Sequence, residues 1–214
     1  MNNLYIFGDS FSTNFTSTNE VEINESWPVL LSEKLNLNLI NHAIIGASNG
    51  EIVNKFFEKY EDIKKDDIVI FEIGFYNRVL DPFQNTTIAI GYDDRFIKVE
   101  MDFFEYKSLD MDEYIRQDLR KMEFIFNYLK TIGVKFYIWC IDRDLDPIKE
   151  KYGFSHFEFV TRKFPDNVIQ YNNQFSFFDN FIKKNPQYWC SDGDKHFNKL
   201  GHLEFFQYLY PYIQ

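Results

Sequence analysis

The hydrophobic positions of this chain alternate between short apolar runs and stretches with helical spacing. Residues 4–7, 37–43, 67–74 and 134–141 form apolar runs of strand length. The run at 67–74 is apolar on both faces, which is typical of a parallel strand buried between two layers of helices. The pattern therefore predicts a core of buried strands that are connected by helices.

Amphipathic stretches follow most of these runs. Ser26 is a candidate cap for the first helix, and Pro28 fits its first turn. The predicted helices cover residues 26–35, 52–60, 115–129, 175–182 and 200–210. Strand–helix alternation of this kind predicts an α/β fold, a three-layer, doubly wound, flavodoxin-like domain with a mostly parallel central sheet. No linker or shift in composition interrupts the chain, so we expect a single domain over 1–214.

Two segments depart from the alternation. Residues 87–90 and 96–101 flank a turn-forming stretch, which predicts a β-hairpin inserted around 86–101. Residues 142–170 are irregular and are a candidate lid loop. The aromatic stretch at 154–164 fits a lid or a wall that contacts a substrate, and it fits equally a loop folded over the core.

Composition adds an acidic balance and a high aromatic content. The 23 basic and 33 acidic residues give a formal net charge of −10, and aromatic residues make up 20% of the chain. Negative charge disfavours binding to nucleic acid or anionic lipid, because like charges repel. No apolar run approaches the roughly 20 residues that span a bilayer, and the N-terminus lacks the features of a secretory signal. We therefore expect a cytoplasmic protein that binds neither nucleic acid nor membrane.

Metal and nucleotide sites have no signature in this sequence. It contains no His-x-x-x-His pair and no closely spaced cysteines. It also lacks the dinucleotide-binding glycine pattern and a Walker-type Gly-Lys-Ser/Thr. The expectation is a protein without a metal site and without a cofactor.

Polar loops follow three of the predicted strands. One begins at Gly8-Asp9-Ser10, and the others cover 46–49 and 74–77. Parallel strands place their carboxyl ends at one edge of the sheet, so these loops are expected to converge there. Ser10 is a candidate nucleophile, and His196 is a candidate base with a carboxylate two residues earlier to orient its ring. Candidate donors to an oxyanion are the N–H groups of Ser10 and Gly46 and the side chain of Asn77.

These blocks, taken in order, resemble the four blocks of the SGNH (GDSL-like) hydrolase family, named for Ser, Gly, Asn and His. Gly8-Asp9-Ser10-Phe11-Ser12 resembles the first block, which supplies the nucleophile. Residues 41–49 resemble the second, whose glycine donates an oxyanion-hole N–H, and residues 194–202 resemble the last, where an Asp–His pair precedes the final helix. Each motif alone is weak, but the ordered set covers nearly the whole chain and is considerably more specific.

The chain departs from the family pattern at two places. The third block is usually Gly-x-Asn-Asp, whereas here Asn77 stands one position late and Arg78 replaces the acid. Asn77 therefore fits an oxyanion donor or a loop residue that binds its own backbone. The aspartate usually stands three residues before the histidine, where this chain has a glycine. Asp194 is the favoured partner of His196, and Asp192 is the alternative.

The resemblance implies a serine esterase or deacylase that uses Ser10, His196 and Asp194 and needs no cofactor. A short acyl group on a carbohydrate or small metabolite is the expected substrate. Two alternatives stay open. One is an acyltransferase with the same site, and the other is a catalytically silent module that binds a glycan or a protein partner.

Several polar residues near these blocks have less specific assignments. Asp9, Asn49 and Arg78 are candidate substrate-binding residues. Glu72 is a carboxylate within an apolar strand, for which an ion pair with Arg78 is the favoured interpretation and a pKa-shifted acid the alternative. His202 is expected to be a structural residue at the start of the last helix rather than the base.

Overall fold

A four-stranded parallel sheet in the order β2-β1-β3-β6 forms the centre of the computed structural model. Its strands are Asn3–Phe7 (β1), Asn38–Asn41 (β2), Ile68–Ile73 (β3) and Lys135–Cys140 (β6). The structure describes residues 2–13, 21–75, 78–81, 86–89, 111–141, 156–174 and 176–214. Only the backbone is described at 78–81, 86–89, 111–112, 114–115, 156–157 and 159. All four predicted strands are confirmed, and strand order reverses between β1 and β3, where ligands bind in doubly wound sheets.

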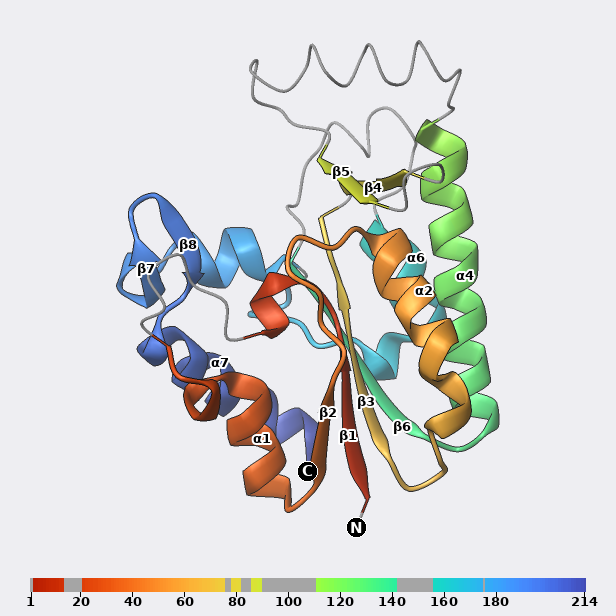
Figure 1. Cartoon of the computed structure of the whole chain (residues 1–214), viewed down its shortest axis with the longest axis horizontal. Coiled ribbons are helices and arrows are strands. Elements are labelled where there is room, and N and C mark those ends of the chain that lie inside the picture. The colour runs from red at the N-terminus through yellow and green to blue at the C-terminus, as the bar shows by residue number, and fades with distance from the viewer. Residues whose placement is uncertain are drawn as a thin grey trace.

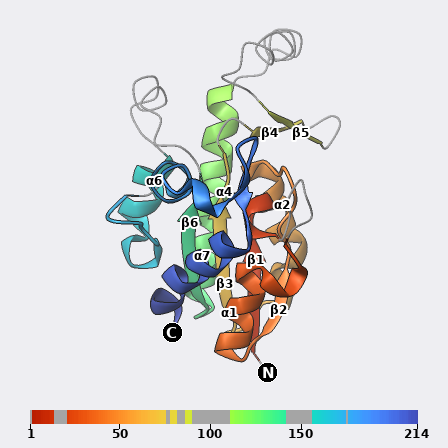
Figure 2. The same ribbon diagram turned by 90° about the vertical axis from the view of Figure 1, so that its left-hand side faces the viewer.

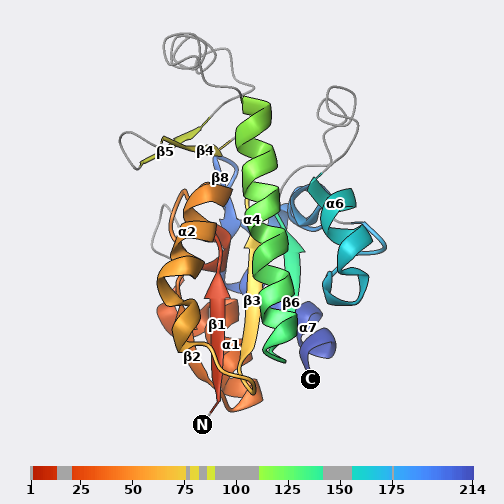
Figure 3. The same cartoon turned by 90° about the vertical axis from the view of Figure 1, so that its right-hand side faces the viewer.

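Helices cover both faces of this sheet (Figure 1). One layer contains Trp27–Leu35 (α1) and Lys199–Ile213 (α7), which lie in front of the strands in Figure 2. The opposite layer contains Asn49–Lys59 (α2), Met111–Thr131 (α4) and His156–Lys163 (α6), with α2 and α4 in front of the sheet in Figure 3. The predicted three-layer α/β fold is therefore confirmed.

Each face of the sheet has its own hydrophobic core, and β1 shows how alternation divides the chain between them. Tyr5 and Phe7 pack on the α2 and α4 side, whereas Leu4 and Ile6 pack on the α1 and α7 side. All four side chains are buried, and burial of each stabilises the fold by about 1.5–3 kcal/mol. A strand that is apolar on both faces can only lie between two layers.

Short helical turns complete the connections. They are Ser10–Ser12 (η1), Ile23–Glu25 (η2), Tyr60–Asp62 (η3), Pro165–Asn167 (η4) and Pro186–Tyr188 (η6), and a π-helical turn at Phe178–Ile182 (η5). The last of these lies within the helix predicted at 175–182. Ser26 stands at the N-cap position of α1 as predicted, but its Oγ donates a hydrogen bond to the carbonyl of Ile23 instead of capping the helix.

The irregular segments differ from their predictions. Arg78–Asp81 (β4) pairs antiparallel with Thr86–Ala89 (β5), so the strand expected at 87–90 has its hairpin partner before it in the chain. The other expected strand, at 96–101, lies outside the described residues. Within the expected lid loop, residues 156–163 form α6 instead of irregular chain. Val160 and Phe164 explain this difference, because they bury their side chains in the core beside α4.

A second hairpin, which was not predicted, carries Asp194 and His196. Trp189–Ser191 (β7) pairs antiparallel with Asp194–Phe197 (β8) around a turn at Asp192 and Gly193. β8 lies against η1, the short turn that follows β1. Among the described residues, no helix has the length and apolar character required to cross a membrane.

Candidate active site

The candidate nucleophile is held in a short turn directly after β1. Ser10 begins the 3₁₀ turn η1, and the side chain of Asp9 caps this turn by accepting a hydrogen bond from the N–H of Phe11 at 2.8 Å. The hydroxyl of Thr13 donates to the carbonyl of Ser10 at 2.8 Å. Only 3% of the surface of Ser10 is exposed. Local hydrogen bonds therefore fix the backbone on both sides of the serine.

The loop after β2 is tied to this turn at two points. The N–H of Ile44 donates to the carbonyl of Gly8 at 2.9 Å, and the side-chain amide of Asn41 donates to the carbonyl of Ser12 at 2.8 Å. Gly46 follows with a φ of 76°, which favours glycine, and no atom would contact a Cβ at this position within 4 Å. Within the described ranges, neither the N–H of Ser10 nor that of Gly46 donates to an acceptor.

The hairpin β7–β8 brings His196 to Ser10 because Phe197 anchors it. Phe197 is buried and packs edge-on against Phe11, with ring centroids 5.7 Å apart. The ring of Phe11 also stacks on the imidazole of His196 at 4.7 Å. The indole of Trp189 donates to the carbonyl of Ile182 at 2.7 Å and fixes the other strand of the hairpin. Apolar packing thus sets the position of a polar group.

A continuous hydrogen-bond chain joins three of the predicted site residues. His196 Nε2 lies 2.7 Å from Ser10 Oγ, and His196 Nδ1 lies 2.6 Å from Asp194 Oδ1. The same carboxylate oxygen accepts the backbone N–H of His196 at 3.0 Å. Asp192, the alternative partner, is exposed in the hairpin turn. The contact with the imidazole is therefore made by Asp194.

Three phenylalanine rings pack together beside the imidazole. Phe75 lies 6.3 Å from Phe11 and 5.6 Å from Phe178, and Phe11 lies 6.5 Å from Phe178, all edge-on. Phe11 stacks on His196, so these rings connect the imidazole to the hydrophobic core. The ammonium of Lys195 lies over the ring of Phe178 at 5.8 Å.

The residues expected to bind substrate are placed differently. Asp9 is fully buried and caps the nucleophile turn, so it is not available to a ligand. Asn49 is also buried, and its amide accepts the N–H of Gly74 at 2.8 Å and donates to the carbonyl of Gly74 at 3.2 Å. These two hydrogen bonds join the start of α2 to Gly74, the residue that follows β3. Asn77 and the side chain of Arg78 lie outside the described residues.

Glu72 has partners other than the predicted one. Its Oε2 accepts the N–H of Asp9 at 3.0 Å and the hydroxyl of Ser12 at 2.5 Å. Burial and the neighbouring carboxyl group of Asp9 raise the pKa of Glu72 well above its ordinary value. The alternative of a pKa-shifted acid agrees with these contacts. The ion pair with Arg78 lies outside the described residues and stays a prediction.

His202 is structural, as the sequence indicated. It is buried, and its Nδ1 accepts the backbone N–H of Trp27 at 3.3 Å. Burial lowers its pKa to about 3, so the ring stays neutral and links α7 to the start of α1.

The sequence reasoning missed the contact of Ser12 with Glu72 and the hairpin that carries Asp194 and His196. A signal for the hairpin was present, because Asp192 and Gly193 are turn formers between two segments with aromatic residues. The contact with Glu72 had no comparable signal, because it joins residues 60 positions apart.

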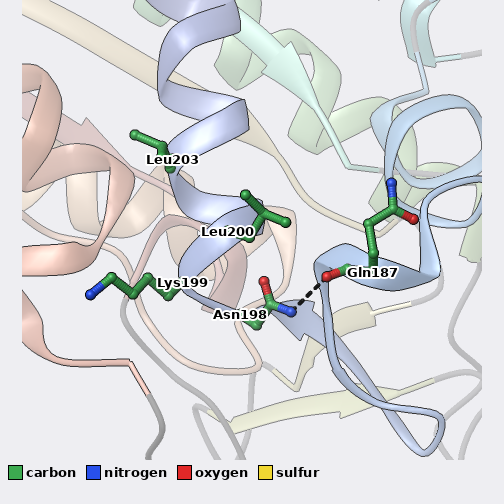
Figure 4. Close-up of a pocket in the computed structure, with 5 residues that line it drawn as sticks. All are labelled: Gln187, Asn198, Lys199, Leu200 and Leu203. Carbon is green, nitrogen blue, oxygen red and sulfur yellow. Dashed lines mark hydrogen bonds between the residues drawn. The ribbon is translucent and has the colours of Figure 1, made fainter.

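A surface pocket of about 490 Å³ lies outside this site (Figure 4). It is lined by Gln187, Asn198, Lys199, Leu200 and Leu203. Asn198 uses its amide to cap α7 and to bind the carbonyls of Gln187 and Trp189. In the part of the chain that the structure describes, no group of three or more His, Cys, Asp or Glu side chains is arranged to hold a metal ion.

Comparisons with known proteins find similarity in structure but not in sequence. No family model and no curated protein sequence matches the chain. Its structure is similar to the esterase EstA of Pseudoalteromonas sp. inhibited by monoethylphosphonate, with a TM-score of 0.61, 14% identity and coverage of 100% of this chain and 97% of that one. An acetyl xylan esterase, AlAXEase, matches with a TM-score of 0.54, 15% identity and coverage of 99% and 100%.

A member of the lipolytic G-D-S-L family from Veillonella parvula matches with a TM-score of 0.51, 11% identity and coverage of 99% and 96%. At these identities the similarity concerns the fold. The chain has the fold of the SGNH (GDSL) hydrolases, as the ordered sequence blocks predicted.

Proposed function

We propose that this chain is a serine hydrolase that cleaves an acyl ester, with Ser10 as nucleophile, His196 as base and Asp194 as the residue that orients the imidazole. The observation that carries the proposal is the hydrogen-bond chain from Ser10 Oγ through His196 to Asp194, with links of 2.7 and 2.6 Å. Both links fall within the reach that proton transfer requires. The fold shared with esterases supports the same class.

The position of Asp194 determines which nitrogen of His196 accepts a proton. A carboxylate beside Nδ1 favours the tautomer in which Nδ1–H donates to Asp194 Oδ1. Nε2 then presents its lone pair, and the hydroxyl of Ser10 donates to it. The stacked ring of Phe11 holds the imidazole in this orientation. The serine is thereby prepared for attack as its proton moves to Nε2.

The reaction follows from this arrangement in two halves. Ser10 Oγ forms a bond to the ester carbonyl carbon, its proton passes to His196 Nε2, and the carbonyl electron pair moves onto oxygen. Collapse of this intermediate breaks the bond to the alcohol, which leaves with the proton from Nε2. Water then attacks the acyl-serine with His196 again as base, and the free acid departs.

The oxyanion requires neutral donors near Ser10. The N–H groups of Ser10 and Gly46 are suited to this role, because neither has an acceptor among the described residues. We assign the side chain of Asn77 as the third donor on the strength of its block in the sequence. Loss of one such donor typically lowers kcat by about 10²–10³-fold.

A short acyl group on a carbohydrate or small metabolite is the proposed substrate. The packed rings of Phe11, Phe75 and Phe178 occupy the apolar space beside His196, which favours a small acyl group over a long chain. A panel of esters that differ only in acyl length tests this point. We expect acetyl esters to be cleaved faster than long-chain esters, and Phe75→Ala to shift the preference toward longer chains. A wild-type preference for long chains would contradict the proposal.

Labelling with a fluorophosphonate probe, read by intact mass, tests the function itself. We expect one label on the wild type and none on Ser10→Ala or His196→Ala. Ser32→Ala is the matched control for the serine, because its hydroxyl donates to the carbonyl of Val29 within α1, and it should be labelled like the wild type. A folded wild type that takes no label overturns the proposal and favours a silent binding module. Detection of free acid, rather than transfer of the acyl group to an added alcohol, separates a hydrolase from an acyltransferase.

A further inference from the structure

A carboxyl group lies buried beneath the nucleophile turn. The side chain of Glu72 is fully buried, and its Oε2 accepts hydrogen bonds from the N–H of Asp9 and the hydroxyl of Ser12. Asp9 and Ser12 flank Ser10 in the chain. Glu72 therefore joins the residues on both sides of the nucleophile to the end of β3.

The second oxygen of this carboxyl group lacks a donor. Glu72 Oε1 is buried and has no hydrogen-bond partner among the described residues when the group is treated as a carboxylate. The neighbouring carboxyl group of Asp9 adds to burial in raising the pKa of Glu72. Two buried carboxylates in contact cannot both stay charged, and one proton between them resolves the repulsion. A proton on Oε1 also removes the charge from the oxygen that lacks a donor.

The backbone at Gly8 is shaped around the same group. A Cβ on Gly8 would lie 2.3 Å from Glu72 Oε2 and 2.7 Å from Ser12 Oγ. No side chain fits between this turn and the carboxyl group, so the close approach depends on glycine. The contact between the turn and Glu72 therefore requires both glycine at position 8 and the buried position of Glu72.

We propose that Glu72 acts as a neutral acid that positions the nucleophile, holding Asp9 and Ser12 so that the hydroxyl of Ser10 points at His196. This inference rests on the proposed hydrolase function and adds a positioning residue to it. Glu72 touches neither His196 nor a substrate, and it acts only through the turn. Misplacement of a reacting atom by about 1 Å can lower turnover by roughly 10²-fold, so this positioning has a measurable consequence.

Two substitutions at Glu72 separate a neutral acid from a charged one. Gln reproduces the hydrogen bonds of the protonated side chain, because its amide donates where Oε1–H would and its carbonyl accepts where Oε2 does. Leu has a similar volume but neither function. We expect Glu72→Leu to lower kcat by roughly 10²-fold with little change in KM, and Glu72→Gln to restore most of that loss.

Controls keep this test clear if Glu72→Leu does not fold. Ser12→Ala removes one hydrogen bond to Glu72 and should lower kcat by about tenfold, the effect of losing one neutral hydrogen bond. Asp67→Ala removes another buried carboxyl group, at the opposite end of β3, and should leave kcat unchanged. Glu72→Leu or Ser12→Ala with wild-type kcat would overturn the positioning role. Equal loss in Glu72→Gln and Glu72→Leu would overturn the neutral acid.

An infrared difference spectrum reads the protonation state without any turnover. We expect wild type minus Glu72→Gln to show the band of a protonated carboxylic acid at neutral pH. Its absence would overturn the inference even if the protein is an active hydrolase. If the band is present but fluorophosphonate never labels the wild type, the proposed function fails and Glu72 remains a protonated acid without a catalytic purpose.

Discussion

β3 carries a buried acidic side chain near each of its two ends, and the surroundings of the two differ. At the amino end, Asp67 accepts hydrogen bonds from the N–H of Asn3, the side-chain amide of Asn3 and the N–H of Lys64. At the carboxyl end, Glu72 faces a second carboxyl group and leaves one oxygen without a donor. The amino end is arranged for stability, with every carboxyl contact favourable.

At the carboxyl end, the close approach of Glu72 to a second carboxyl group has an electrostatic cost, and this end lies beside the proposed nucleophile. Local consistency between sequence and structure is usually relaxed at functional sites, and the neighbouring acids Asp9 and Glu72 are an example. The difference between the two ends indicates that this fold tolerates destabilising contacts at the carboxyl end of β3. It also predicts that loss of the Asp67 carboxyl group lowers stability alone, whereas loss of the Glu72 carboxyl group lowers activity.

Ser10→Ala, at the carboxyl end of the sheet, is the substitution with the largest expected effect on kcat. Loss of the nucleophile should lower kcat on a short-chain ester by at least about 10⁴-fold. The free energy of unfolding should stay within about 1 kcal/mol of wild type, because a single hydroxyl is lost. Steady-state kinetics and urea unfolding measure the two quantities. Retention of wild-type turnover would remove Ser10 from the site.

Gly8→Ala tests how tightly the carboxyl end is packed. The added Cβ would lie 2.3 Å from Glu72 Oε2, so we expect a loss of about 3 kcal/mol in the free energy of unfolding. Gly74→Ala is the matched control, because its Cβ would meet no atom closer than 3.4 Å. Thermal and urea unfolding of both variants provide the measurement. Equal stability of the two would show that the turn can move away from Glu72.

Asp67→Ala tests the amino end. It leaves the N–H groups of Asn3 and Lys64 without their acceptor, and we expect a loss of about 1–2 kcal/mol in stability. Turnover should be unchanged, because the residue lies at the end of the sheet that is remote from Ser10. Urea unfolding and ester hydrolysis are measured on the same preparation. A drop in kcat without a drop in stability would contradict the division between the two ends.

The smallest effect concerns the pH dependence of stability. The folded state raises the pKa of Glu72 above its ordinary value of 4.5 through burial and the adjacent Asp9. A group with a raised pKa contributes its stability fully below that ordinary value and loses it as pH rises through the folded pKa. The free energy of unfolding of wild type should therefore fall relative to Glu72→Gln as pH increases above 4.5.

A series of urea unfolding curves at increasing pH checks this difference. Asp118, whose pKa burial raises to about 6, contributes equally to both proteins and cancels in the comparison. Parallel pH profiles for wild type and Glu72→Gln would mean that Glu72 has an ordinary pKa in the folded protein.

The predicted strands and the long helices agree with the structure because their signals are local and repeated. Leu119, Met122, Phe126 and Leu129 recur at helical spacing, and all four are buried on the inner face of α4. The segments that differ lack such repetition. Residues 156–163 contain aromatic and charged residues that fit a loop, and only the packing of Val160 against the core favours a helix.

The candidate site was predictable to the extent that its residues stand in ordered blocks. Ser10, Gly46 and His196 were identified from those blocks, and the structure brings Ser10 and His196 within 2.7 Å. The roles expected for Asp9 and Asn49 did not follow, because sequence does not reveal that their side chains turn inward to bind backbone groups. A polar residue in a loop motif can stabilise the loop backbone instead of binding a substrate.

The sequence by itself predicted the layered fold and the candidate nucleophile and base, because apolar periodicity and the order of the motifs can be read along the chain. Only the tertiary structure decided that Asp194 rather than Asp192 contacts His196, because one of them faces the ring and the other lies in an exposed turn. It alone placed the carboxyl group of Glu72 beneath Ser10. Hydrogen bonds between residues far apart in sequence depend on directions and distances that exist only once the sheet has formed.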